Sequence, residues 1–235
     1  MKVKTFVVNL SRRKDRRGRI STIIPSFLDV NFTSDLGLEV DGKNLPMNLF
    51  KHVGLFPWKI NSDNFWWKRP LKKGEIGCAL THLHCWKYIV DKKIELSLIL
   101  EDDIIFADSF DTKLQVILDK LRNHKVYWDL LYLGRDPLSK DEFLFEDIVK
   151  PGYSFGTYAY MITNKGAKKL LDTHYEESLI PADEFLSAMC TYHPRSDVCQ
   201  RYKPTLNAYA VNPSLVFSHS MSNDNSDTED SDFIE

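Results

Sequence analysis

Short apolar runs alternate with helical patterns along this chain, and this alternation most constrains its fold. Residues 4–10, 96–100 and 130–133 are apolar runs of the kind found in strands that are buried on both faces of a sheet. Helical spacing of apolar residues lies between these runs, most clearly at residues 74–91. The pattern predicts an α/β fold in which helices flank a mostly parallel, twisted sheet.

The size and composition of the chain narrow the classes of protein further. Its 235 residues fit one large domain, which we expect over residues 1–221, followed by an acidic and partly disordered tail at residues 222–235. The formal net charge of -2 gives no basic field to recruit nucleic acid. We expect no membrane span, because no apolar stretch approaches the roughly 20 residues that one requires. No signal-peptide apolar region follows the N-terminus, so a cytoplasmic location is the default expectation.

An acidic triplet, Glu101-Asp102-Asp103, ends the apolar run at residues 96–100. Ligands of open α/β sheets bind at the carboxyl ends of the strands, which is where this triplet is predicted to lie. Carboxylate oxygens suit Mg²⁺ or Mn²⁺, and such ions keep coordination positions open for substrate phosphates. A solvated acidic turn is the alternative interpretation, since acid clusters after strands are common.

A basic turn after the first apolar run is expected at the same edge of the sheet. Arg12 and Arg16 have a planar group that pairs well with phosphate, although an exposed charged helix face explains some of the arginines here. The sequence lacks the glycine-rich motifs of P-loop proteins and of classical dinucleotide-binding folds. Any nucleotide is therefore expected to bind the turn at residues 9–16, the Asp41-Gly42 turn and a metal ion.

Two further segments carry residues that can do chemistry. Pro181-Ala182-Asp183-Glu184 puts two carboxylates at a predicted helix N-terminus, where Asp183 as a simple N-cap is the alternative. His219 follows the last predicted strand; a lone histidine is usually structural, but neutral imidazole also binds Mn²⁺. The aromatic residues at 153–161 indicate core and sheet rather than a sugar platform. Those at 56–67 lie in a long loop, which in a compact domain is often functional.

Taken together, these segments resemble glycosyltransferase family 25, and within it the catalytic domain of collagen galactosyltransferases. The resemblance covers nearly the whole chain. The matching segments, in order, are Val8-Asn9-Leu10-Ser11-Arg12-Arg13-Lys14-Asp15-Arg16-Arg17, Val40-Asp41-Gly42, residues 69–78, Thr81-His82, Trp86, Glu101-Asp102-Asp103, residues 128–135, 157–160 and 166–171, Pro181-Ala182-Asp183-Glu184-Phe185-Leu186, His193-Pro194, and Ser226-Asp227-Thr228-Glu229.

The resemblance implies a GT-A fold, a UDP-hexose donor and dependence on Mn²⁺. In the collagen branch the donor is UDP-galactose and the acceptor is hydroxylysine of a collagen-like polypeptide. Bacterial relatives instead modify lipopolysaccharide, so a glycan acceptor is the alternative. The segments at residues 181–186 and 226–229 favour the collagen branch.

The resemblance also suggests roles for the candidate residues in an inverting, single-displacement transfer. Glu101 and Asp103 are predicted to bind Mn²⁺ with His219 as the third protein ligand, while Asp102 orients the ribose or the motif itself. The predicted general base is Asp183, with Glu184 the second candidate. Candidates for the uridine and phosphate contacts are Val8, Asn9, Arg12, Arg16, Asp41 and Lys73.

Two other functions remain as alternatives at this stage. A metal-dependent phosphohydrolase or nuclease could use the same acids, although the sequence lacks an Asp-x-Asp-x-Thr/Val nucleophile motif. A non-catalytic sugar- or collagen-binding module derived from an enzyme is the other alternative, and the intact acids at 101, 103 and 183 count against it.

Overall fold

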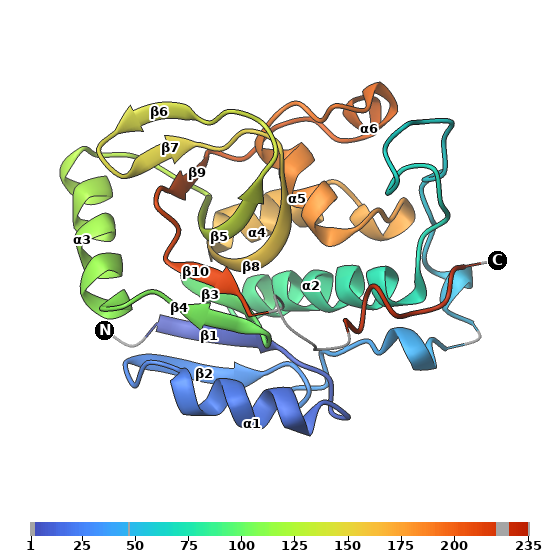
Figure 1. The fold of residues 1–235 in the computed structure, drawn as a ribbon, viewed down its shortest axis with the longest axis horizontal. Helices are drawn as coiled ribbons and strands as arrows, with labels where there is room; N and C mark the ends of the chain where they lie inside the picture. The colour runs from blue at the N-terminus through green and yellow to red at the C-terminus, as the bar shows by residue number, and fades with distance from the viewer. Residues whose placement is uncertain (1–2, 47, 220–225, 235) are drawn as a thin grey trace.

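An eight-stranded sheet with the order β2-β1-β3-β8-β5-β9-β7-β6 lies at the centre of the molecule (Figure 1). The computed structural model describes residues 3–46, 48–219 and 226–234. Strands β10 and β4 form a separate two-stranded ribbon. In chain order the strands are β1 (Val3–Val8), β2 (Leu28–Phe32), β3 (Leu96–Glu101), β4 (Ile104–Phe106), β5 (Leu130–Pro137), β6 (Glu142–Phe145), β7 (Ile148–Lys150), β8 (Ser154–Thr163), β9 (Ala208–Val211) and β10 (Val216–Ser218).

Strand directions in the large sheet are mixed. Parallel pairs join β1 to both β2 and β3, and β5 to β9. Strand β8 runs antiparallel to β3 and β5, and β7 runs antiparallel to β6 and β9. The predicted α/β class is confirmed, with more antiparallel pairing than the mostly parallel sheet that we expected. The physical reason is that β6, β7 and β8 follow β5 without a crossover helix, and parallel neighbours need such a crossover.

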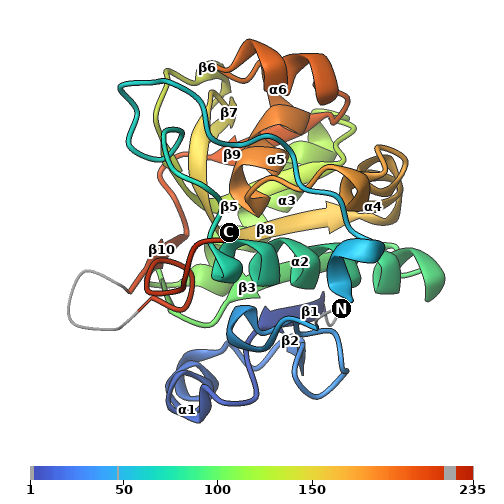
Figure 2. The same cartoon turned by 90° about the vertical axis from the view of Figure 1, so that its right-hand side faces the viewer.

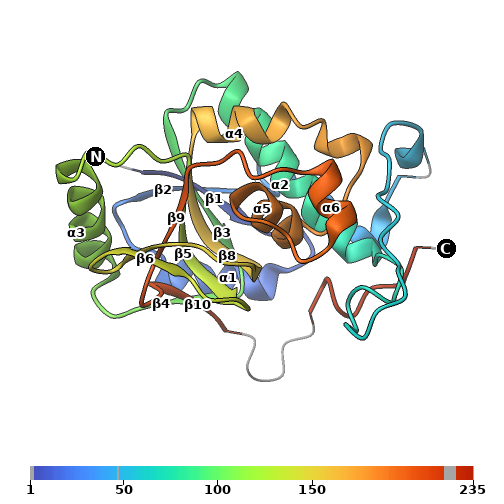
Figure 3. The same cartoon turned by 90° about the horizontal axis from the view of Figure 1, so that it is seen from above.

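Helices cover both faces of the sheet (Figure 3). The apolar side chains of strand β3 alternate between the two cores: Ile99 packs with α2, whereas Leu98 and Leu100 pack with α3. Within the described ranges, no helix is both long enough and apolar enough to cross a membrane. The helices are α1 (Lys14–Ile23), α2 (Lys73–Asp91), α3 (Phe110–Asn123), α4 (Asn164–Leu171), α5 (Ala182–Cys190) and α6 (Ser196–Arg201), with short 3-10 helices η1 (Gly42–Asn44), η2 (Leu49–Lys51) and η3 (Tyr175–Glu177).

Residues 226–234 lie against the N-terminal end of α2 (Figures 1 and 2). The Gly74 N–H donates to the Ser231 hydroxyl at 2.8 Å, and the Ile234 N–H donates to the Leu71 carbonyl at 2.8 Å. A Cβ atom at Gly74 would lie 2.4 Å from the Asp227 carbonyl oxygen, so this close approach requires glycine. These residues belong to the tail predicted as partly disordered, and in the structure they have defined partners. Residues 222–225 and 235 of that tail lie outside the described residues.

Candidate active site

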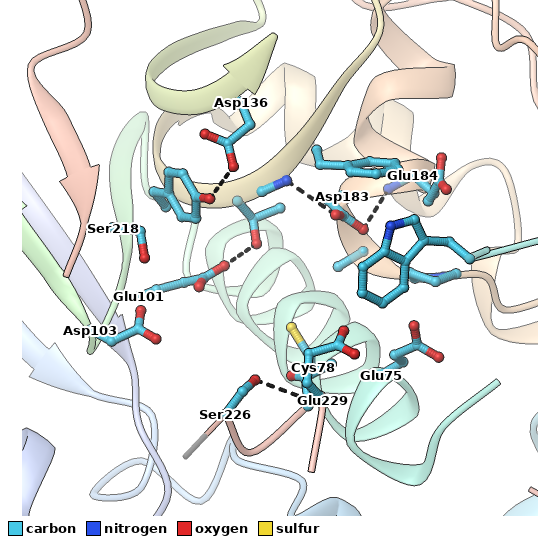
Figure 4. Close-up of a pocket in the computed structure, with 18 of the residues that line it drawn as sticks. Glu75, Cys78, Glu101, Asp103, Asp136, Asp183, Glu184, Ser218, Ser226 and Glu229 are labelled. Atoms are coloured by element: carbon cyan, nitrogen blue, oxygen red, sulfur yellow. Dashed lines mark hydrogen bonds between the residues drawn. The ribbon is translucent and has the colours of Figure 1, made fainter. Parts of the chain in front are cut away.

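Two adjoining cavities lie beside the carboxyl ends of β1 and β3. The larger has a volume of about 450 Å³ and the smaller about 120 Å³. Both are lined by Arg16, Cys78, Glu101 and Asp103. In the larger cavity, Glu101 and Asp103 lie on one side and Asp183 and Glu184 on the other (Figure 4). The structure thus brings the predicted metal-binding acids and the predicted bases to one cavity.

The three acids at the end of β3 have different partners. Asp102 is buried, and its carboxylate accepts hydrogen bonds from the Asn9 amide at 2.7 Å and from Arg16 at 3.1 Å. Asp103 accepts from the same guanidinium at 3.1 Å. Glu101 accepts a hydrogen bond from the Thr157 hydroxyl on β8. Asp102 therefore ties the motif to the turn after β1, while the side chains of Glu101 and Asp103 border the larger cavity.

The predicted third metal ligand, His219, lies beside Asp103. Its backbone N–H donates to the Asp103 carbonyl at 2.6 Å. Both the His219 Nδ1 atom and the Asp103 Oδ1 atom are buried without a hydrogen-bond partner among the described residues. Unpartnered buried acceptors of these two kinds fit a divalent cation such as Mn²⁺. The described part of the chain holds no group of three or more His, Cys, Asp or Glu side chains arranged around a metal position, so a cation here would need further ligands from a substrate.

Charge in the cavity also favours a cation. Burial, and then the charge of the neighbouring Asp103 carboxylate, raise the pKa of Glu101 to about 8. Burial is also the largest cause of the raised pKa of Asp102, which the hydrogen bond from Asn9 and the charge of Arg16 partly offset. A cation near these carboxylates would stabilise their ionised forms.

The predicted nucleotide contacts divide into two groups. Four of the candidates, counting Asp102, which was predicted to orient the ribose, line the smaller cavity: Val8, Asn9, Arg16 and Asp102. Gly42 of η1 and Gly74 of α2 line it as well. A cavity that lies between a strand end, a turn and a helix N-terminus offers backbone N–H groups as well as side chains to a ligand.

The other three candidates, Arg12, Asp41 and Lys73, line neither of these two cavities. Arg12 donates to Asp41 at 2.8 Å and forms an ion pair with Asp227 at 2.7 Å, and these partners hold the pKa of Arg12 above its usual value. The Lys73 side chain points to Asp232 at 3.5 Å. The turns that carry these three residues lie near the site, as the sequence predicted. The three side chains, however, bind the C-terminal segment and each other.

Asp183 lies in the first turn of α5 and lines the larger cavity. The alternative that Asp183 is the N-cap is wrong, because that position is occupied by Pro181. The Asp183 carboxylate accepts hydrogen bonds from the backbone N–H of Gly156 at 3.1 Å and from that of Glu184 at 2.9 Å. Burial, and then the charge of Glu184, raise the pKa of Asp183 to about 7. A carboxyl group with this pKa is suited to act as a general base near neutral pH.

Several residues of the larger cavity were not predicted from the sequence. The interpretation of residues 153–161 as core and sheet holds for Tyr160, which is fully buried, whereas Phe155 and Tyr158 line the cavity. Gly156, with a φ of +76°, interrupts the regular alternation of this strand between them, and its place within the aromatic run was the available signal. Trp58 and Trp66 of the long loop also line the cavity.

The fold and the cavity define an α/β protein with an acidic, ligand-sized site at the carboxyl ends of its parallel strands. Residues 2–186 match glycosyltransferase family 25, described as "LPS biosynthesis protein", and the chain therefore belongs to this family.

Relatives of known name are similar over most of this chain. Procollagen galactosyltransferase 1-A of Xenopus laevis is 34% identical, with 96% of this chain and 38% of that protein covered. Procollagen galactosyltransferase 2 of Homo sapiens is 33% identical, with 90% and 34% covered. The probable inactive glycosyltransferase 25 family member 3 of Rattus norvegicus is 32% identical, with 90% and 37% covered. The chain thus spans less than two fifths of the length of each of these relatives.

Two solved structures show a weak likeness at 10% sequence identity. They are A197 from STIV, with a TM-score of 0.36, and mouse xyloside xylosyltransferase 1, with a TM-score of 0.35. Each match covers 92% of this chain and 83% of the other. Likeness at this level bears on neither the function nor the site.

Proposed function

We propose that this chain is an inverting glycosyltransferase that moves a hexose from a UDP-sugar to an acceptor hydroxyl. The observation that supports it most is the larger cavity, which has Glu101 and Asp103 on one side and Asp183 on the other. Its volume of about 450 Å³ lies within the range of small-ligand sites, roughly 300–1,000 Å³.

The donor would lie across the two adjoining cavities. Part of its nucleoside would enter the smaller one, beside Val8 and Asn9, and its diphosphate would lie near Arg16, which lines both. Mn²⁺ bound by side chains from the set Glu101, Asp103 and His219, with its remaining ligands supplied by the donor diphosphate, would provide Lewis-acid stabilisation of the UDP leaving group. Asp102 would keep these acids in place through its bonds to Asn9 and Arg16.

Asp183 would act on the acceptor side. In a single displacement, the acceptor oxygen forms a bond to the anomeric carbon while the bond from that carbon to UDP breaks. The acceptor hydroxyl proton moves to the Asp183 carboxylate. Its pKa of about 7 leaves a large ionised fraction at neutral pH and makes it a stronger base than an ordinary aspartate.

The identities of sugar and acceptor rest on the relatives. The names of the Xenopus and human relatives support galactose as the sugar and a procollagen-like polypeptide as the acceptor. Hydroxylysine as the modified residue rests on the resemblance to collagen galactosyltransferases alone. The description of the family as an LPS biosynthesis protein supports a glycan acceptor as the alternative.

A non-catalytic binding module is the second candidate function. Relatives named as inactive or probably inactive stand among the matches at similar identity, which favours it. Such a module would bind a UDP-sugar or an acceptor without transferring the sugar.

A two-stage experiment tests the proposal. Thermal unfolding is first measured with a panel of UDP-sugars, with and without Mn²⁺, and transfer is then assayed on a hydroxylysine peptide and on a lipooligosaccharide. The proposal expects Mn²⁺-dependent stabilisation by a UDP-hexose and transfer to one of the acceptors. Binding without transfer to either acceptor would favour the second candidate, and no stabilisation by any UDP-sugar would contradict the proposed transferase.

A further inference from the structure

Glu184 borders the larger cavity, but its side chain is engaged within the protein (Figure 4). The residue is only 3% exposed. One carboxylate oxygen accepts a hydrogen bond from the Trp67 indole N–H at 3.1 Å. The other accepts from the Tyr153 hydroxyl at 2.8 Å and lies 2.7 Å from Nε2 of His193.

The proton on His193 can be assigned from its second nitrogen. Nδ1 accepts a hydrogen bond from the Arg195 backbone N–H at 3.0 Å, so Nε2 carries the proton and donates it to Glu184. Three donors therefore converge on one carboxylate, which suits its ionised form and leaves little room for an acceptor hydroxyl. Asp183, in contrast, accepts hydrogen bonds from two backbone N–H groups and from no side chain in the described ranges.

The donors to Glu184 belong to a network that holds the aromatic loop at residues 56–67. Within this loop, the Trp58 indole donates to the Trp66 carbonyl at 3.0 Å, and the Ile60 N–H donates to the Trp67 carbonyl at 2.8 Å. The Arg195 guanidinium lies 4.4 Å from the centroid of the Trp58 ring and donates to the Trp58 carbonyl at 2.6 Å.

We infer that Glu184 is a positioning residue that, by anchoring Trp67, holds the wall formed by Trp58 and Trp66 at the Asp183 end of the cavity. The inference rests on the proposed function, in which this end receives the acceptor. Two indole side chains fit the apolar face of a sugar ring or the methylene chain of an acceptor side chain. Proton transfer then falls to Asp183 alone, and Glu184 determines how well the acceptor is held.

Two variants test this role through kinetics. Glu184→Gln places an amide N–H₂ against at least one donor, and Trp67→Phe removes the indole N–H from the anchor while keeping a smaller aromatic ring there. Each is expected to raise the acceptor KM about tenfold or more while the donor KM and kcat change by less than about threefold, because a hydrogen bond to a charged group is lost. The acceptor KM of the double variant should exceed that of the more impaired single variant by no more than about twofold, since both substitutions remove the same contact.

A catalytic role for Glu184 predicts a different pattern. If Glu184 were the base, Glu184→Gln would lower kcat by roughly 10²–10⁴-fold, with the rise in rate near pH 7 lost, and Trp67→Phe would leave kcat unchanged. That result would overturn the inference. Glu142→Gln, at an exposed site on the β6–β7 hairpin that lines neither cavity, is the matched control and should leave every parameter unchanged.

Hydrogen exchange separates this inference from the proposed function. Backbone amides at Ile60 and Trp67 are expected to exchange faster in Glu184→Gln and in Trp67→Phe than in the wild type or in Glu142→Gln. This readout needs no substrate, so it tests the anchor even if the wild type transfers no sugar. Unchanged exchange in both variants would overturn the anchor, whereas absence of transfer with faster exchange would overturn only the proposed function. Should Glu184→Gln fail to fold, Trp67→Phe alone decides the outcome.

Discussion

Replacement of Asp183 with Asn should remove most of the transfer activity while leaving the donor site intact. Removal of a general base typically costs about 10²–10⁴-fold in rate, which corresponds to roughly 3–5.5 kcal/mol of transition-state stabilisation. Among the described residues, the Asp183 carboxylate accepts hydrogen bonds from the backbone N–H groups of Gly156 and Glu184, and neither Gly156 nor Glu184 lines the smaller cavity. UDP-sugar affinity is therefore expected to stay within about twofold of the wild type.

The pH dependence of the wild type follows from the same carboxyl group. With the pKa of Asp183 raised to about 7, about one tenth of the side chains are ionised at pH 6 and about nine tenths at pH 8. The rate should rise about tenfold over this range, and the Asn variant should lose this rise. The free energy of unfolding changes with pH in the opposite direction to the rate. Because the carboxyl pKa is raised in the folded state, the wild type loses stability as the pH rises from about 4 towards 7, and the Asn variant lacks that loss.

Steady-state kinetics between pH 5.5 and about 8.5, together with calorimetric titration of the UDP-sugar, measures both quantities. Glu142→Gln, at an exposed residue that lines neither cavity, controls for the loss of one acid. An Asn variant that transfers sugar at the wild-type rate would refute the base assignment. An Asn variant that no longer binds the UDP-sugar would instead place Asp183 in the donor site.

Three further predictions concern the metal, a close backbone contact and a buried ion pair. Asp103→Asn should lower UDP-sugar affinity at least about tenfold in Mn²⁺ and much less without it, by calorimetric titration; an equal loss in both conditions would contradict the metal role. Gly77→Ala should lower the free energy of unfolding by about 1–3 kcal/mol, because its Cβ would lie 2.5 Å from the Val40 carbonyl oxygen. Gly18→Ala has nothing within 4 Å of its Cβ and should raise the free energy of unfolding by up to about 1 kcal/mol. Urea unfolding measures both, and a change of the same sign in both variants would refute the argument. Arg69→Met leaves the Glu75 carboxylate, now paired at 2.7 Å, without its buried partner and should cost about 3–5 kcal/mol in the same assay; a loss below about 1 kcal/mol would show that the pair is not needed.

The elements with strong local patterns could be predicted from the sequence. The apolar runs gave β1, β3 and β5, and helical periodicity gave α2 with its 19 residues. The end of the strand at Glu101 was visible because the apolar run stops at three acids. These features depend on neighbours a few residues apart, which is the range over which a sequence pattern is informative.

The contacts that complete the site join residues that are far apart in the chain. Trp67 and Glu184 are 117 residues apart, and Arg13 and Asp227 are 214 apart. No periodicity signals such a contact, so the aromatic loop and the C-terminal segment could not be assigned partners. Two other strands were missed because they are short. Glu142 and Phe143 of β6 are exposed at the edge of the sheet, where a strand carries little of the apolar pattern, and β7 has only three residues.

Transfer of a hexose from a UDP-sugar in the presence of Mn²⁺ tests the central claim most directly. A hydroxylysine peptide and a lipooligosaccharide are incubated with UDP-galactose, and the products are analysed by mass spectrometry with the release of UDP measured in parallel. The account predicts one hexose added to one of these acceptors, release of an equal amount of UDP, and loss of both with Asp183→Asn. Release of UDP without glycosylated acceptor, or equal transfer by Asp183→Asn, would contradict it.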